Sequence, residues 1–105
     1  MRIAKPTKIR SKKIRQAAEG QRCTIRNWHT CNHNPETVVF AHLPGNKGTG
    51  SKNHDLFGIF ACEGCHSWID RRSMYEFSDA HYKDLMRAYQ ETLLILIDKG
   101  IIEVK

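Results

Sequence analysis

Four cysteines in two short stretches are the side chains of this sequence best suited to bind a metal ion. In "ACEGCHSWID" (61–70), Cys62 and Cys65 have two residues between them, a spacing that lets both thiolates face one ion. Cys23 and Cys31 form a looser pair, with seven residues between them. The four thiolates together predict a tetrahedral structural zinc site.

Other ligand sets fit the same stretches. His29 and His33 lie close enough to Cys31 in the sequence for an imidazole to replace one thiolate. His66, directly after the second pair, is a candidate spare zinc ligand or a hydrogen-bond partner of a ligand. A further alternative leaves all four thiols without a metal.

A second metal site is suggested by His66 and Asp70, which the cysteine site leaves free. In a helix that starts near Gly64 these two residues are four positions apart and share one face, so both can bind one ion. His42 ends a predicted strand, and we expect His42 and His66 to meet in one cleft if the helix packs across the strands. Alternatively, His42 is a hydrogen-bonded core residue and Asp70 pairs with a neighbouring arginine.

Length and composition favour one small domain that a metal stabilises. A chain of 105 residues has a modest core, and domains of this size often need a disulfide or a metal. The sequence shows neither a signal peptide nor an apolar run of the about 20 residues that span a bilayer. We therefore expect a cytoplasmic protein with reduced cysteines and no membrane partner.

The formal net charge of +6 is concentrated at the N-terminus. Seven lysines and arginines precede Glu19, the first acidic residue, and such a segment favours a polyanionic partner such as nucleic acid. The alternative is a basic tail that only adds solubility. We divide the chain into a basic flexible arm, 1–10, and a single zinc-containing domain, 11–105.

Turn residues and hydrophobic patterns predict an α+β domain. Two strands, 37–42 and 56–61, are expected to pair antiparallel across the glycine-rich loop 43–55. Three helices complete the domain: one from Ser11 to Gly20, a short one within 62–72, and a long one over 78–100 that Ser78 caps and Gly100 ends.

The long helix carries an apolar stripe that we expect in the core, and over 78–99 it also offers a seam for a homodimer. The stripe consists of Tyr82, Leu85, Met86, Tyr89, Leu93, Leu96 and Ile97. Trp28 and Trp68 are expected to cover the cysteine site rather than to stack on bases. His54 and His81 have no chemical companion nearby in the sequence and are expected on the surface.

Several segments resemble the HNH, or ββα-metal, nuclease motif. "FAHLPGN", the loop, and "HDLFGIFACEGCHSWID" match its order of a histidine ending a strand, a loop, a second strand, and Cys-x-x-Cys-His before a metal-binding helix. Over roughly residues 15–105, with "NPET", "GTG" and "IDRR" included, the chain is similar to the YbcO-like nucleases of lambdoid prophages. The resemblance implies a zinc-stapled HNH-like core with a flanking N-terminal helix and a long C-terminal helix, in a bacterial host cell.

The resemblance also implies roles for individual residues. His42 matches the general base that activates the attacking water, and Asp55 lies near the position that orients this histidine. His66 and Asp70 match the ligands of a catalytic Mg²⁺ or another divalent ion. The sequence departs from the pattern at Ala41, where many HNH nucleases have a further metal ligand.

The predicted function is a phage or prophage metal-dependent endonuclease that hydrolyses DNA phosphodiester bonds. The alternative is a non-catalytic, zinc-stabilised module that binds nucleic acid, and a third possibility is a protein-interaction domain. The residues expected to contact nucleic acid are Lys12, Lys13, Arg15, Lys47, Arg71 and Arg72.

Overall fold

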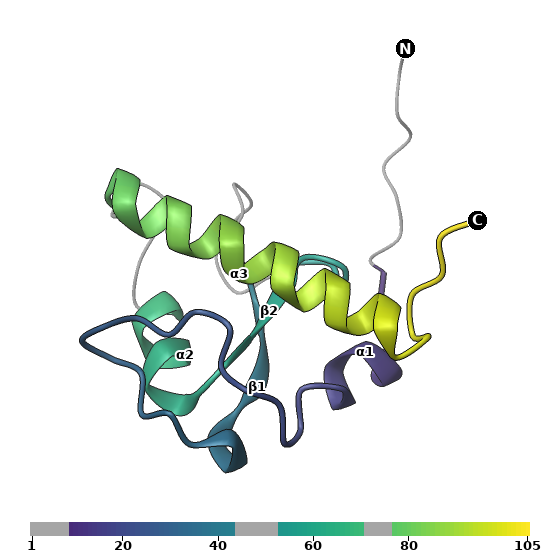
Figure 1. Ribbon diagram of the computed structural model, residues 1–105, viewed down its shortest axis with the longest axis horizontal. Helices are drawn as coiled ribbons and strands as arrows, with labels where there is room; N and C mark the ends of the chain where they lie inside the picture. The colour runs from purple at the N-terminus through teal and green to yellow at the C-terminus, as the bar shows by residue number, and fades with distance from the viewer. Residues whose placement is uncertain (1–8, 44–52, 71–76) are drawn as a thin grey trace.

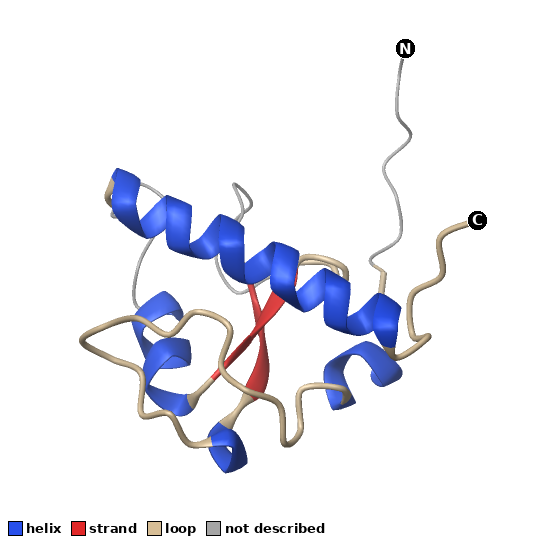
Figure 2. Ribbon diagram, viewed as in Figure 1, coloured by secondary structure: helices blue, strands red, loops and turns tan. Residues whose placement is uncertain are grey.

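The computed structural model describes residues 9–43, 53–70 and 77–105. Within these ranges, two strands form one sheet and three α-helices surround it (Figures 1 and 2). The predicted α+β class and the order of the main elements are confirmed. In chain order the elements are α1 (Lys12–Gln16), a 3-10 turn (Pro35–Thr37), β1 (Val39–His42), β2 (Gly58–Ala61), α2 (Glu63–Asp70) and α3 (Asp79–Asp98).

The two strands pair antiparallel, as predicted, with Val39 opposite Ala61 and His42 opposite Gly58. Each strand begins two residues later than predicted, at 39 and at 58. The preceding residues are in turns instead. Asn34 caps the 3-10 turn with its side chain, and the N–H of Phe57 bonds the carbonyl of His54. All four residues of β2 are buried, so this strand lies at the centre of the core.

The long helix α3 lies across β2 (Figure 1) and closes one side of the core. Its start at the Ser78 cap is as predicted, and Gly100 follows its end with a φ of +72°, which glycine adopts without strain. The predicted stripe is partly wrong, because Tyr82, Met86 and Ile97 are exposed. The buried residues of α3 are Leu85, Ala88, Thr92 and Leu96.

The buried face of α3 is set by its contact with β2. Thr92 Oγ1 accepts a hydrogen bond from the N–H of Phe60 at 3.3 Å and lies 3.3 Å from the hydroxyl of Thr24. Ala88, fully buried, has a side chain small enough for close packing at a helix contact. Ala88 and Thr92 therefore occupy the contact between α3 and β2. A search for large apolar residues at helical spacing does not select either of them.

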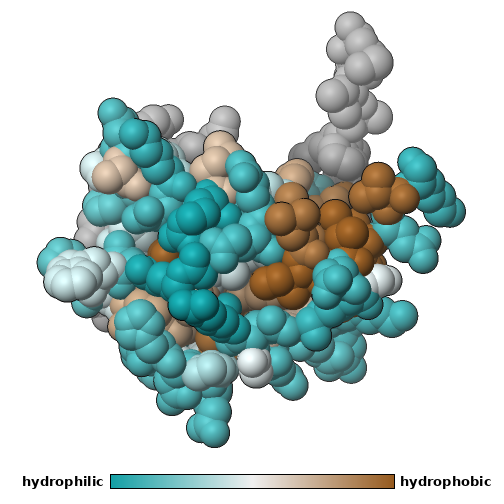
Figure 3. Space-filling model, viewed as in Figure 1, coloured by the Kyte–Doolittle hydropathy of each residue, from teal (hydrophilic) through white to brown (hydrophobic). Residues whose placement is uncertain are grey.

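The surface is divided between polar and apolar areas. Figure 3 shows apolar side chains gathered over the C-terminal half of α3 and the segment after it, where Leu94, Ile97 and Val104 are exposed. No helix in the described ranges has both the length and the apolar composition needed to cross a membrane.

Candidate metal centre and histidine site

The four cysteines meet at one point, as predicted. All four lie within the described residues, all are free thiols, and their Sγ atoms lie within 4.8 Å of one another. Cys23, Cys62 and Cys65 are buried and Cys31 is partly exposed. The loop after α1 supplies the first pair, and the junction of β2 with α2 supplies the second, so the cluster joins segments that are distant in sequence.

The geometry of this cluster fits a zinc ion. Four sulfurs around zinc at about 2.3 Å, arranged tetrahedrally, lie about 3.8 Å apart. The sulfurs of Cys31 and Cys62 are 3.9 Å apart. Backbone N–H groups of Arg26, Asn32 and Cys65 point at cluster sulfurs from 3.4 to 3.5 Å, an arrangement that stabilises thiolates.

Hydrogen bonding and burial shift the pKa values of three of the thiols in different directions. A hydrogen bond from the Cys65 thiol lowers the pKa of Cys23 to about 4, because it stabilises the Cys23 thiolate. The same bond, together with burial, raises the pKa of Cys65. Burial raises the pKa of Cys31 to about 11. A divalent ion would favour the deprotonated form of all four, so metal binding releases protons here.

The loop between Cys23 and Cys31 packs directly against α2. A Cβ atom added to Gly64 would lie 1.9 Å from the carbonyl oxygen of Thr30, so only glycine permits this approach. The Thr30 hydroxyl is also 3.4 Å from the sulfur of Cys65. Gly64 lies in the first turn of α2 and serves as the contact surface for the loop.

His42 and Asp55 form a close pair at the end of β1. The imidazole Nε2 lies 2.7 Å from Asp55 Oδ1, and the side chain of His42 is 14% exposed. Asp55 is 1% exposed, although it lies in a polar segment of the sequence. The pair places a buried carboxylate beside an imidazole that solvent still reaches.

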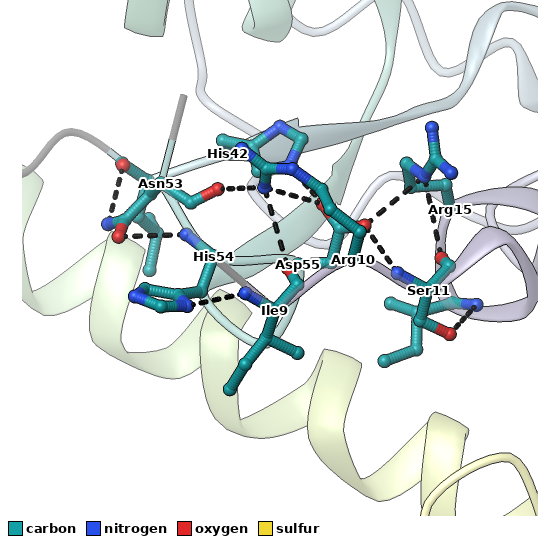
Figure 4. Close-up of polar contacts among 10 residues, drawn as sticks. Ile9, Arg10, Ser11, Arg15, His42, Asn53, His54 and Asp55 are labelled. Atoms are coloured by element: carbon teal, nitrogen blue, oxygen red, sulfur yellow. Dashed lines mark hydrogen bonds and ion pairs between the residues drawn. The ribbon is translucent and has the colours of Figure 1, made fainter. Parts of the chain in front are cut away.

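Asp55 also holds the start of the domain in place (Figure 4). Its Oδ2 accepts a hydrogen bond from the N–H of Ser11 at 2.7 Å and lies 3.2 Å from Arg15 Nε. Arg10 reaches Oδ1 from 3.3 Å. One buried carboxylate therefore connects the histidine of β1 to the cap of α1.

These contacts keep Asp55 ionised. Burial raises the pKa of its carboxyl, but the hydrogen bonds from His42 and Ser11 and the charges of His42 and Arg15 outweigh this effect, so the pKa is lowered below its ordinary value. An ionised carboxylate only accepts hydrogen bonds. In the neutral imidazole, Nε2 therefore carries the proton and Nδ1 keeps its lone pair.

His66 and Asp70 lie on one face of α2, as their spacing predicted. His66 Nε2 is 3.2 Å from Asp70 Oδ2, and the two side chains are 37% and 60% exposed. This pair is a two-ligand site at most. Within the described ranges, the cysteine cluster is the one group of three or more Cys, His, Asp or Glu side chains close enough to share an ion.

The residues predicted to contact nucleic acid are only partly described. Lys12 and Lys13 are exposed on α1, while Arg15 is tied to Asp55 but remains 48% exposed. Lys47, Arg71 and Arg72 lie outside the described residues. Of the basic arm 1–10, Ile9 and Arg10 are described, and both contact the segment 53–55.

Two histidines that were expected to have no companion have structural partners. His54 Nδ1 accepts the N–H of Ile9 at 2.9 Å. His81 forms a reciprocal cap with Ser78 at the start of α3 and packs its ring against Trp68. The spacing of Ser78 and His81, that of a capping box, was a signal for the second role. No local signal marks the first, because its partner is 45 residues away.

Two arginines and Glu91 tie the cysteine loop to α3, and no sequence pattern indicated these contacts. Arg26 makes two hydrogen bonds to the carboxylate of Glu91, at 3.0 and 2.8 Å. Arg87 bonds the same carboxylate and the backbone carbonyls of Thr24 and Ile25. His33, considered above as a ligand, lies 3.6 Å from the sulfur of Cys31 and so adjoins the cluster.

Comparisons with known proteins agree with one another. Residues 12–97 match the family model described as "Putative nuclease YbcO". Relatives called "Putative nuclease YbcO", from Escherichia coli K12, and "Putative nuclease ybcO", from Enterobacteria phage 82, are each 42% identical to this chain over 94 residues. Each match covers 86% of this chain and 96% of the relative.

A solved structure extends the likeness to the fold. The structure of "a putative bacteriophage protein" from Escherichia coli K-12 superposes on this chain with a TM-score of 0.63 at 34% identity. The match covers 84% of this chain and all of the other. The chain therefore belongs to the YbcO family, whose members are named as nucleases at the "putative" level.

Proposed function

We propose that this protein is a metal-dependent endonuclease of the HNH type that hydrolyses phosphodiester bonds in DNA, with His42 as its general base. The observation that carries the proposal is the contact between His42 Nε2 and the buried carboxylate of Asp55. This contact fixes the ring and leaves Nδ1 to accept a proton from water. The family names and the order strand, loop, strand, helix support it.

His66 and Asp70 are the residues that would hold the catalytic ion. They offer one nitrogen and one carboxylate oxygen from consecutive turns of α2. A divalent ion such as Mg²⁺, which accepts a water-rich shell, would neutralise charge on the scissile phosphate and stabilise the leaving oxygen. His66 then binds the ion and does not transfer a proton.

The four cysteines would hold a structural zinc ion, separate from the catalytic centre. Their cluster fixes the start of α2 and thereby the position of His66. Exposed Lys12 and Lys13, with Arg15, Lys47, Arg71 and Arg72, are proposed to contact the DNA backbone. Self-association through α3 is a further part of the proposal, and the exposed Leu94 and Ile97 support it.

One observation favours the alternative, a zinc-stabilised module that binds nucleic acid without cleaving it. Ala41, which takes the place of a metal ligand of many HNH nucleases, is fully buried and offers no ligand atom. A module of this kind binds DNA through charge, so its affinity falls steeply with salt and does not depend on His42.

Cleavage of plasmid and branched DNA with Mg²⁺ or Mn²⁺ tests the proposal. We expect His42→Ala to lower the cleavage rate about 100-fold or more, because it removes the proton acceptor. His54→Ala, which removes a neighbouring imidazole that contacts Ile9 and not Asp55, is the matched control and keeps the wild-type rate. Equal rates for wild type and His42→Ala, or no cleavage by the wild type, would count against the enzyme.

A further inference from the structure

Trp28 is exposed, whereas the sequence predicted that it covers the cysteine cluster. Its side chain is 89% exposed, the largest value among the large hydrophobic residues that the structure describes, whereas Trp68 is 7% exposed. The expectation that both tryptophans cover the cysteine cluster is therefore wrong for Trp28. An exposed indole offers a large, flat apolar face with a polar N–H, which suits it to contact a ligand.

Hydrogen bonds hold the loop in place both before and after Trp28 in the sequence. The buried Asn27 accepts the N–H of His29 on its side chain at 3.0 Å and the N–H of Cys31 on its carbonyl at 2.9 Å. On the other side, the guanidinium of Arg26 is fixed by Glu91. A ring presented from such a loop loses little conformational entropy when it binds a flat ligand.

The loop also rests on the helix that carries the proposed metal ligands. Thr30 contacts Gly64 and the sulfur of Cys65 in the first turn of α2. In Figure 1 this loop, in dark blue, lies beside α2. The loop that carries Trp28 and the helix that carries His66 are therefore packed against each other. A DNA strand bound at α2 would lie near this loop.

The chemistry around Trp28 favours a nucleic-acid base over a protein. No acidic residue occurs from 20 to 35, a segment that contains two histidines and two arginines, one of which, Arg26, is paired with Glu91 of α3. His29 lies edge-on to the indole, with 6.4 Å between the ring centres. Trp28 is also the one large hydrophobic residue exposed in this segment, all of which is described. A protein interface would need further apolar residues around it.

We propose that Trp28, with His29 beside it, is a stacking platform for an unpaired base of DNA. This inference rests on the proposed function only in assuming that the ligand is nucleic acid. Aromatic rings stack on bases of any sequence, and a paired base does not offer its face. The platform therefore prefers single strands, or the unpaired bases of branched substrates, to continuous duplex.

Binding measurements test the platform without cleavage. The zinc-loaded His42→Ala protein, without added Mg²⁺, is titrated into a fluorescein-labelled single-stranded 15-mer and into its blunt duplex, and anisotropy is recorded. We expect Trp28→Ala to weaken single-strand binding about 5- to 100-fold. Duplex binding, which depends on charge, is expected to be unchanged. Trp28→Phe is expected to retain most of the single-strand affinity, and Trp28→Leu to lose it.

Two controls make the result specific. Val104→Ala removes another highly exposed apolar side chain, from the C-terminal segment, and is expected to bind both DNAs like the parent. Intrinsic fluorescence should be quenched by the single strand in the parent but not in Trp28→Phe, which keeps only the buried Trp68.

Several results would overturn the platform. They are single-strand affinity unchanged in Trp28→Ala, rescue by Leu as good as by Phe, no DNA binding by the parent, or a dimer in sedimentation that Trp28→Ala dissociates. Failure of the proposed nuclease is a different result, because a chain that cleaves no DNA can still bind single strands through Trp28.

Discussion

At the scale of single residues, the site depends on one buried carboxylate. Asp55 accepts from His42 and from the N–H of Ser11, and it lies against Arg10 and Arg15. The sequence placed Asp55 near His42 only through a family resemblance. The partners at the start of the domain are 40 or more residues away in the sequence, and no local pattern connects them.

We predict that Asp55→Asn lowers the free energy of unfolding by about 1–3 kcal/mol at pH 7, because an amide NH₂ then faces the buried donors of Ser11 or His42. The folded pKa of Asp55 is lowered, so its contribution to stability is present above the ordinary value of about 3.9 and is lost as pH falls through the folded value. The difference between wild type and variant should narrow as pH falls below about 4, where the carboxylate of the folded wild type gains its proton.

Urea unfolding of the two proteins, compared at each pH, measures this difference. A difference that persists unchanged in acid would show that the ionised carboxylate is not the stabilising species.

At the scale of elements, local signals located the helices and strands, and tertiary contacts decided their faces. Ser78 and Gly100 predicted both ends of α3, because capping depends on adjacent residues. The buried face was predicted less well. Thr92 is fully buried through its bond to Phe60, whereas Met86 is 60% exposed, and hydrophobicity alone ranks these two in the opposite order.

At the scale of elements, we predict the effect of replacing Gly64 by alanine. In most helices, replacing glycine by alanine stabilises by about 1 kcal/mol. In α2 we expect the opposite sign, a loss of about 1–3 kcal/mol, because the new methyl group would meet the backbone oxygen of Thr30 at 1.9 Å. Because that oxygen belongs to the loop between the first two cysteines, affinity for zinc should fall as well.

Thermal unfolding and competition with a zinc chelator measure the two effects. Ser67→Ala, at an exposed position of the same helix, is the control and is expected to leave zinc affinity unchanged. A Gly64→Ala protein that is more stable than wild type and binds zinc equally well would contradict the close contact between loop and helix.

At the scale of the whole molecule, the cysteine cluster joins the loop after α1 to the junction of β2 with α2. The sheet has only two strands, and α1 is five residues long. The sequence predicted this cluster correctly, since Cys-x-x-Cys is a specific signal and only four cysteines are present. It could not predict the Arg26–Glu91 contact that fastens the loop to α3, because that pair is 65 residues apart.

Removal of zinc should therefore unfold the domain rather than only inactivate it. Structural zinc is worth on the order of 10 kcal/mol in small domains, which is comparable with the about 5–15 kcal/mol of total stability of a typical domain.

We expect a high-affinity zinc chelator at pH 7 to abolish the cooperative thermal transition seen by circular dichroism, and added Zn²⁺ to restore it. Cys62→Ser, which replaces a fully buried cysteine of the cluster, should behave like the chelated protein. Added Mg²⁺ should restore neither, because it prefers oxygen ligands to thiolates. A chelated protein that still melts cooperatively near the wild-type temperature would show that the apolar core around β2 suffices without the metal.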